Sequence, residues 1–214
     1  MSKPYTESNL SEIFDTDLTW RRKELSDIKS TIKSTDTYSK PIFLKALIAM
    51  GYAHWEGYIK TCATRYFEHL TLRKLPYSNY ERQIYINSIL VRLDTLTQSR
   101  ANVKERCNII NEILDGGNSR FSYINPLLID TKSNLNTDVI SDLCTICGVD
   151  DKYFISKRTF IDTILLKRRN AIAHGQQENI QADEIDNFVH ELLTLMEHFR
   201  TLLENKVYTK GYSA

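Results

Sequence analysis

The scarcity of helix-breaking residues is the feature that most constrains how this chain folds. Its 214 residues include only seven glycines and four prolines. Between them, apolar residues recur mostly at intervals of three and four, the spacing that places side chains on one face of an α-helix. The sequence therefore predicts an all-α protein, and a chain of this length can bury a substantial core without disulfide bonds or metal ions.

The apolar pattern divides the chain into expected helices and one poorly patterned stretch. Helices are expected at about residues 8–35, 39–70, 79–97, 137–147, 157–173 and 181–206. An irregular insertion is expected at about residues 98–136, containing a short helix at 107–114, a turn at 115–118 and a short extended piece at 121–124.

Two details of the first two helices carry further expectations. Gly51 and Gly57 lie inside a helical pattern, where glycine costs about 1 kcal/mol relative to alanine, so we expect another element to approach closely at these positions. The aromatic and basic residues 20–23 are expected to form a solvated face of the first helix.

The stretch Arg168-Arg169-Asn170-Ala171-Ile172-Ala173-His174-Gly175 holds the residues most informative about chemistry. On a helix, Asn170 and His174 share one face, and the long side chain of Arg169 reaches it. His174 falls in the last turn, where unpaired carbonyl groups favour an imidazolium, and Gly175 suits the left-handed conformation that ends a helix. The apolar stripe of this helix points in a different direction, so Arg169, Asn170 and His174 are free to contact another molecule or segment. The stripe is made by Phe160, Ile161, Ile164, Leu165 and Ile172.

A histidine beside a guanidinium suits phosphate chemistry, because imidazole exchanges protons near neutral pH and the arginine stabilises negative charge. The alternative is a histidine at a helix end among ordinary surface basic residues. Since the net charge is only +1, binding to nucleic acid would depend on a local basic patch. Such a concentration is formed by Lys157, Arg158, Lys167, Arg168 and Arg169.

The order Arg169-Asn170-Ala171-Ile172-Ala173-His174 resembles the Arg-x4-His signature of the HEPN superfamily of small helical nucleases. Residues 52–60 resemble the early core helix of standalone bacterial HEPN proteins from toxin and defence settings, and residues 134–136 and 147–150 are similar to the same group. The resemblance covers most of the chain. It implies a single HEPN-like domain, residues 1–214, built as an up-down helical bundle of four to five main helices with the insertion at about 98–136.

The resemblance also implies an activity. HEPN proteins typically pair as two-fold dimers that bring two Arg-x4-His motifs into one cleft, which implies a homodimeric, metal-independent endoribonuclease acting on RNA in a toxin–antitoxin or phage-defence system. An antitoxin or a defence-system protein is then an expected partner. In this role His174 transfers protons, Arg169 stabilises phosphate charge, Asn170 orients its neighbours, and Arg168 is a weaker candidate for contact with substrate phosphate. Glu56 is expected either to support this site from the facing helix or to lie at the surface.

Two other functions remain open. The chain could be a non-catalytic HEPN module that binds a nucleotide, RNA or a protein partner, or a purely structural helical subunit. No cofactor and no metal are expected, because the sequence lacks a phosphate-binding glycine loop, a Gly-x-Ser-x-Gly element and an acidic cluster.

The four cysteines, Cys62, Cys107, Cys144 and Cys147, are too scattered for a disulfide framework. Cys144 and Cys147 form a Cys-x-x-Cys pair inside an apolar helical pattern without a second ligand pair, so we expect core cysteines rather than a zinc or redox site. Reduced cysteines, the absence of an apolar leader segment and the absence of any apolar run near the ~20 residues that span a membrane predict a cytoplasmic protein with no membrane partner.

Overall fold

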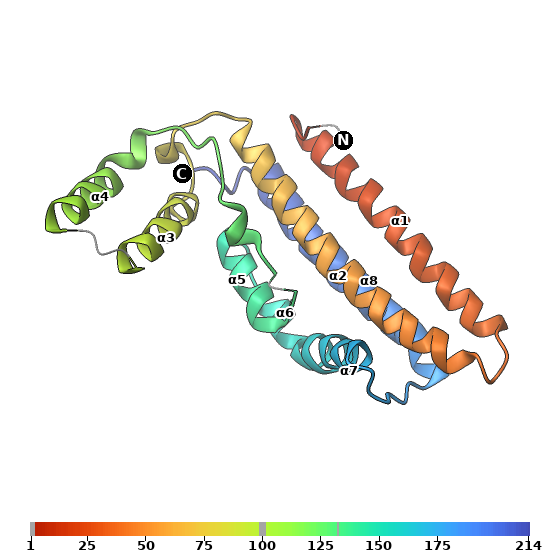
Figure 1. Ribbon diagram of the computed structural model, residues 1–214. Coiled ribbons are helices and arrows are strands. Elements are labelled where there is room, and N and C mark those ends of the chain that lie inside the picture. The colour runs from red at the N-terminus through yellow and green to blue at the C-terminus, as the bar shows by residue number, and fades with distance from the viewer. Residues whose placement is uncertain (1–2, 99–101, 132) are drawn as a thin grey trace.

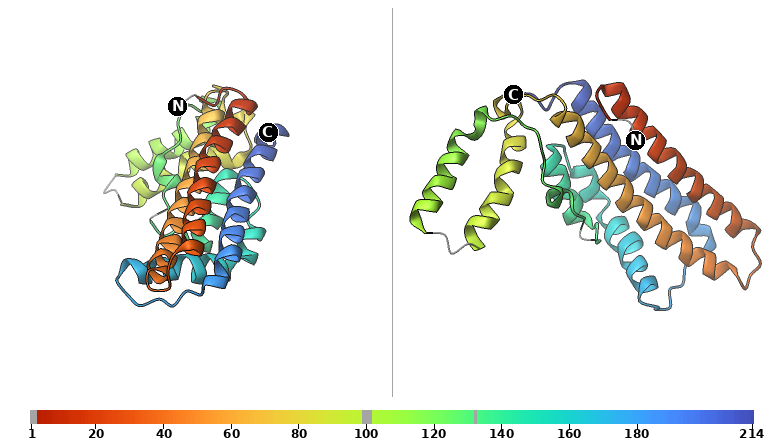
Figure 2. Two further views of the ribbon diagram at one scale, coloured as in Figure 1. Left: turned by 90° about the vertical axis from the view of Figure 1, so that its right-hand side faces the viewer. Right: turned by 45° about the horizontal axis from the view of Figure 1, so that its top comes forward.

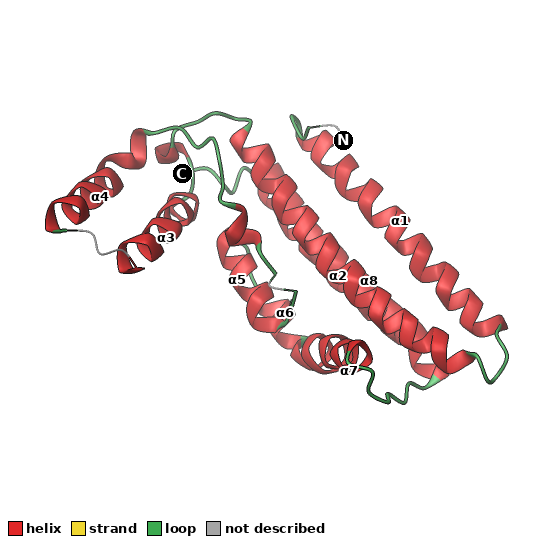
Figure 3. Cartoon of the chain, in the orientation of Figure 1, coloured by secondary structure: helices red, strands yellow, loops and turns green. Residues whose placement is uncertain are grey.

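Helices make up most of the chain in the computed structural model, which describes residues 3–98, 102–131 and 133–214. The described residues contain no strand, only two isolated bridge pairs, and helices joined by loops dominate the cartoon (Figure 3). The α-helices are α1 (Glu7–Ser34), α2 (Lys40–Thr71), α3 (Arg82–Gln98), α4 (Val103–Asp115), α5 (Thr137–Cys147), α6 (Lys152–Ser156), α7 (Arg168–Ala173) and α8 (Ile185–Tyr208). Between α6 and α7 lies a π-helical segment, Thr159–Lys167. Short 3-10 turns are Tyr77–Asn79, Gly116–Asn118, Pro126–Ile129 and Ala182–Glu184.

The three longest helices, α1, α2 and α8, pack side by side (Figures 1 and 2). α1 runs antiparallel to α8, as shown by ion pairs spread along the two helices: Lys33–Asp186 at 3.2 Å, Arg22–Glu197 at 2.5 Å and Asp15–Arg200 at 2.5 Å. The π-helical segment and α7 pack against α2. The predicted all-α, up-down bundle is therefore confirmed, with α1, α2, α5, the α6–α7 segment and α8 as its main helical units.

Local signals in the sequence explain where several helices begin and end. Thr6 and Asn9 form a capping box at the start of α1, and Asn136 accepts a hydrogen bond from the Val139 N–H at 2.8 Å at the start of α5. Gly148 ends α5 with a left-handed φ of +66°. The apolar periodicity of α1 predicts a buried stripe of seven residues. Five of them are buried, and Ile13 and Ile28 are half-buried. The buried residues are Leu10, Phe14, Leu18, Leu25 and Ile32.

Gly51 and Gly57 mark the predicted close approaches. A Cβ at Gly51 would lie 2.9 Å from the Phe188 ring of α8, and a Cβ at Gly57 would lie 2.9 Å from Nη1 of Arg21 on α1. Both distances are shorter than carbon normally tolerates, so each glycine makes room for a specific neighbouring side chain.

Arg21 contradicts the expectation that residues 20–23 form a solvated face. It is only 7% exposed, its Nε donates to Asp17 at 2.9 Å, and its Nη1 donates to the His54 carbonyl at 3.3 Å. Burial of a guanidinium is tolerated because its charge is paired and its donors are used. Arg22 and Lys23 are exposed, as expected.

His54 on α2 is a second buried polar residue, beside Arg21. Burial lowers the pKa of His54, and the Arg21 guanidinium lowers it further. The carboxylates of Glu24, whose Oε2 lies 3.2 Å from His54 Nε2, and of Asp17 oppose this shift. At neutral pH the imidazole is therefore held in its uncharged form between α1 and α2.

α3 and α4 form a hairpin that stands away from the bundle of α1, α2 and α8 (Figures 1 and 2). The Tyr85 hydroxyl of α3 donates to the Ile113 carbonyl of α4. α4 is longer than the helix predicted at 107–114, because Asn102 and Glu105 form a capping box that starts it at Val103.

The remainder of the predicted insertion contains little helix. The stretch predicted as extended, 121–124, is non-helical, and the Phe121 N–H donates to the Leu75 carbonyl at 2.9 Å. Residues 99–101 and 132 of the predicted insertion lie outside the described residues.

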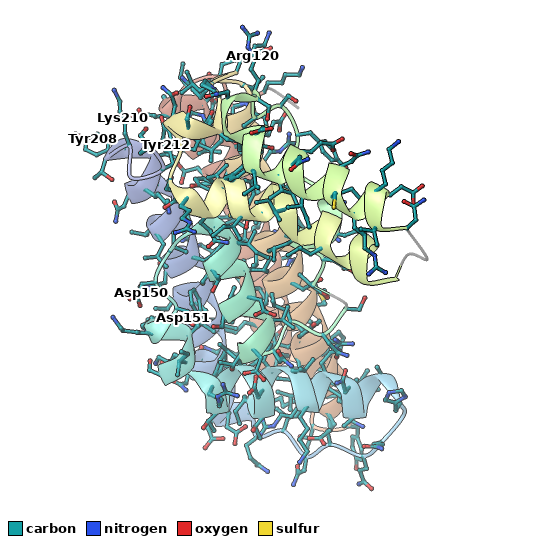
Figure 4. The ribbon with its side chains drawn as sticks, turned by 90° about the vertical axis from the view of Figure 1, so that its left-hand side faces the viewer. Arg120, Asp150, Asp151, Tyr208, Lys210 and Tyr212 are labelled. Carbon is teal, nitrogen blue, oxygen red and sulfur yellow. The ribbon has the colours of Figure 1, made fainter. Side chains whose placement is uncertain are left out.

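The C-terminal residues pack against the base of the hairpin. Tyr80 and Ser213 form an isolated bridge, and the Glu81 N–H donates to the Tyr212 carbonyl at 2.7 Å. The buried Lys206 pairs with Glu81 at 2.5 Å. In Figure 4 the labelled C-terminal residues lie at the same end of the molecule as Arg120: Tyr208, Lys210 and Tyr212. Within the described part of the chain, no helix has the length and apolar character needed to cross a membrane.

Candidate active site at the end of α7

The helix expected at 157–173 is present, but its middle is not α-helical. Residues Thr159–Lys167 form π-helical turns, whose hydrogen bonds close over five residues instead of four. Leu166 joins Ile161 and Leu165 in the core as a result, whereas Phe160 and Ile164 of the predicted stripe are only half-buried. π-helical turns are frequent at functional sites, and this one leads directly into the motif.

α7 ends where the sequence predicts. Gly175 has a φ of +70°, and the N–H groups of Gly175 and Gln176 donate to carbonyls of the last turn at 3.1 and 2.9 Å. This arrangement is a Schellman motif, which satisfies the carbonyls that a helix end otherwise leaves unpaired. It places His174 at the exposed end of the helix, with its N–H bonded to the Asn170 carbonyl at 3.0 Å. The His174 side chain makes no hydrogen bond to a described residue, so the imidazole is accessible.

The Arg169 side chain packs against other parts of the chain. This differs from the expectation that the polar side chains of the motif lie apart from the face that packs in the core. Its guanidinium carbon lies 3.8 Å from the centroid of the Tyr52 ring on α2, and its Nη2 donates to the Ser133 carbonyl at 2.6 Å. Its Nε is buried and has no hydrogen-bond partner among the described residues. A planar guanidinium stacks readily on an aromatic face, so α2 fixes the position of the motif arginine.

Tyr52 is the residue of this site to which the sequence assigned no role. It is buried, and its hydroxyl accepts a hydrogen bond from the Leu135 N–H at 2.7 Å. Burial raises the pKa of Tyr52, the nearby Glu56 carboxylate adds to the shift, and the Arg169 guanidinium opposes it. The sequence held one signal for a role of Tyr52 near this site: Tyr52 lies four residues before Glu56, a predicted site residue, and the two therefore share a face of α2.

Glu56 lies near Tyr52 but does not contact the motif. Its Oε1 accepts a hydrogen bond from the buried hydroxyl of Thr131. No hydrogen bond or ion pair between described residues joins it to Arg169 or His174. Glu56 thus ties Thr131 to α2, two residues before the Ser133 whose carbonyl accepts from Arg169.

The predicted basic patch is largely paired with carboxylates. Arg168 forms an ion pair with Glu184 at 2.9 Å, Lys157 pairs with Glu191 at 2.7 Å, and Arg158 pairs with Asp138 at 2.8 Å. These cations should attract a nucleic acid less strongly than the sequence suggests, because a neighbouring carboxylate partly neutralises each of them. Arg168 also lines a pocket of about 250 Å³ with apolar walls, whose other residues are Ile48, Phe160, Ile164, Ile180, Glu184, Ile185, Asn187 and Phe188.

The structure therefore places the predicted motif residues on α7 and its C-cap, and Glu56 on α2, but does not join them. Arg169 points to α2, Arg168 to Glu184, and His174 lies exposed at the helix end; Asn170 is half-buried. Within one chain this is one histidine and one anchored arginine.

Comparison with known proteins identifies the family. A model of the family described as RiboL-PSP-HEPN matches residues 16–205, a range that includes the motif and the α2 residues behind it. No curated protein and no solved structure matches the chain. The chain therefore belongs to the RiboL-PSP-HEPN family, whose HEPN domain indicates a nuclease or an RNA-related module.

Proposed function

We propose that the protein is a metal-independent endoribonuclease that acts as a homodimer. The observation that carries this proposal is an accessible His174, five residues after an arginine that α2 holds in place, within a chain of a HEPN family. A two-fold axis near α7 would bring two copies of this pair together and supply the second histidine.

In the proposed reaction the 2′-oxygen of a ribose attacks the adjacent phosphorus, and the bond to the 5′-oxygen of the next nucleotide breaks. One His174 accepts the proton of the 2′-hydroxyl, and its symmetry mate protonates the leaving oxygen. The two copies of Arg169 stabilise the negative charge on the phosphorane. The products are a 2′,3′-cyclic phosphate and a 5′-hydroxyl, and DNA is not a substrate because it lacks the nucleophile.

The test is cleavage of RNA in the presence of EDTA. Wild-type protein should release cyclic-phosphate ends, and His174→Ala should abolish the cleavage. His190→Ala is the matched control, because His190 is exposed on α8 and has no part in the site. Cleavage that His174→Ala leaves intact would rule out the proposal.

Arg169 needs a more careful variant because it packs on Tyr52 and bonds to Ser133. Arg169→Lys keeps the charge but loses the planar contact, so it separates fixed geometry from charge alone. We expect it to lose most cleavage while its thermal unfolding shows a folded protein. Full activity of a folded Arg169→Lys variant would remove the assigned role of the guanidinium.

The dimer and the biological setting are parts of the same proposal. Mixing wild-type protein with an excess of the His174→Ala variant should lower the activity per wild-type chain, because mixed dimers carry an incomplete site. As a toxin or a defence effector, the wild-type protein should arrest the growth of cells that express it without a cognate antitoxin, whereas the His174→Ala variant should not.

One observation favours a second candidate, a non-catalytic HEPN module that binds a nucleotide, RNA or a protein. The Arg169 guanidinium is committed to Tyr52 and Ser133 instead of lying beside His174. Such a module would bind RNA without product formation, and its affinity would fall steeply with salt.

A further inference from the structure

α4 carries an apolar stripe that the described chain leaves uncovered. Val103, Cys107, Ile110 and Leu114 are spaced four, three and four residues apart, which places them within about 60° of one another around the helix. All four are exposed; Val103 is 77% exposed, Ile110 49% and Leu114 75%. No residue of α4 is buried.

The hairpin covers only the other apolar side of α4. Ile109 and Ile113 are half-buried, and the Ile113 carbonyl accepts the bond from Tyr85 of α3. A helix of 13 residues is at the length where isolated helices are marginal in water. Helical stability in proteins comes mainly from packing of an amphipathic face, so the exposed stripe is the surface on which α4 lacks support.

The charges beside the stripe indicate what covers it. Lys104 and Asp115 lie on the same flank of the helix, one at its start and one at its end. Both are exposed, and neither forms an ion pair with a described residue. A helix that is basic at one end and acidic at the other along one flank is complementary to its own copy in the reverse direction.

We infer that α4 pairs antiparallel with α4 of a second copy of this chain, about a two-fold axis that passes between Cys107 and Ile110. Around such an axis the same flank of each helix faces its mate, so Lys104 of each copy faces Asp115 of the other. The apolar stripes meet between these charges. Four apolar side chains per copy form a small interface, so the pairing is weak, with a dissociation constant on the order of micromolar.

This surface is separate from the motif. α4 lies at the outer side of the projecting hairpin, whereas α7 lies at the end of the bundle (Figure 1). The inference does not depend on RNA cleavage, so the His174→Ala variant should pair through α4 as well as the wild type does.

Cys107 provides a direct test. In the antiparallel pair the two Cys107 Cα atoms lie about 6 Å apart, from the rise per residue and the usual distance between packed helices, and a disulfide spans such a distance. Cys62, Cys144 and Cys147 are buried, so mild oxidation addresses Cys107 alone. We expect a disulfide-linked dimer of the wild type that Cys107→Ser abolishes.

The matched control moves the thiol off the stripe. Asn108 is exposed and points away from the stripe, so the Cys107→Ser/Asn108→Cys variant should cross-link at least about tenfold more slowly. Equal rates for the two cysteines would show random collision and overturn the inference. The absence of cross-linking by Cys107 would overturn it as well.

A charge exchange tests the direction of the pairing. In sedimentation velocity over a range of concentrations, Lys104→Glu and Asp115→Lys should each raise the dissociation constant about tenfold, because each places like charges opposite one another twice per dimer. The double variant should restore pairing. A double variant as weak as either single variant would exclude the antiparallel two-fold arrangement.

Ile110→Glu provides the last control, because it places a carboxylate in the middle of an exposed stripe without disturbing the core. It should abolish cross-linking through Cys107 while the circular dichroism stays that of the folded protein. Unchanged cross-linking in this variant would show that the stripe is not the contact surface.

Discussion

The stacked pair of Tyr52 and Arg169 allows the position of the motif arginine to be tested separately from its charge. Tyr52→Phe keeps the ring 3.8 Å from the guanidinium carbon and removes only the hydroxyl. Tyr52→Leu removes the aromatic face as well. The two variants therefore share one lost hydrogen bond and differ in the stacking contact.

The hydroxyl of Tyr52 accepts from the Leu135 N–H at 2.7 Å in a buried position. A buried N–H without an acceptor costs about 1–3 kcal/mol, so both variants should lose this much free energy of unfolding. Loss of the cation–π contact should lower the stability of Tyr52→Leu by about 1 kcal/mol more.

Cleavage should separate the variants more clearly than stability does. Under the proposed ribonuclease activity, Tyr52→Phe keeps the ring on which Arg169 stacks, so its cleavage rate should stay near that of the wild type. In Tyr52→Leu the guanidinium loses about 1 kcal/mol of positioning energy, and the rate should fall several-fold to about tenfold.

Urea unfolding gives the two stabilities, and single-turnover cleavage under folding conditions gives the two rates. A Tyr52→Leu enzyme as active as Tyr52→Phe would refute the argument that the ring positions Arg169. A Tyr52→Phe protein as stable as the wild type would refute the assigned hydrogen bond.

Three further predictions concern glycines and a buried histidine. Gly57→Ala should destabilise the protein by about 1–3 kcal/mol through the clash with the Arg21 guanidinium; in an Arg21→Ala background the same change should instead stabilise it by up to about 1 kcal/mol, the helix propensity gain, as urea unfolding will show. Gly175→Ala should cost about 1–2 kcal/mol because of its left-handed φ, whereas Gly117→Ala, with equally open surroundings and no positive φ, should be nearly neutral. The pKa of His54 is lowered in the folded protein, so the unfolded chain binds a proton at His54 more readily, and the free energy of unfolding should fall as the pH drops below about 6.5. Urea unfolding at neutral and mildly acidic pH should show a weaker pH dependence of stability for His54→Gln than for the wild type. An unchanged pH dependence in this variant would contradict the prediction.

The positions of the helices were largely predictable, because they depend on local signals. The boundaries of α1, α2 and α5 lie within two residues of the expected ones, since a capping box begins α1, a proline lies in the first turn of α2, and an asparagine cap and a glycine bound α5. Gly175 is another such signal, and α7 ends at Ala173 as expected, with His174 as its C-cap. Cys144 and Cys147 are buried, as predicted for core cysteines, and Cys62 is buried with them.

Three features were not predictable from periodicity. Arg21 follows Leu18 by three residues and precedes Leu25 by four, so its position on the buried stripe was visible, but its burial depends on Asp17 and on a carbonyl of α2. The π-helical turns at 159–167, in a segment that packs against α2, are another such feature. His198 on α8 is half-buried, because its ring packs with its centroid 4.1 Å from that of Tyr153.

The sequence by itself determined the helical class, the end of α7 and the residues of the motif, because periodicity, capping and glycine conformation act over a few neighbouring residues. Only the tertiary structure decided that Arg169 stacks on Tyr52, that Arg168 pairs with Glu184, and that His174 is exposed. These outcomes depend on which side chains of distant segments share a space, and a side chain satisfies its charge with whatever neighbour the fold brings within reach. The motif thus combines one arginine fixed by α2 with one accessible histidine.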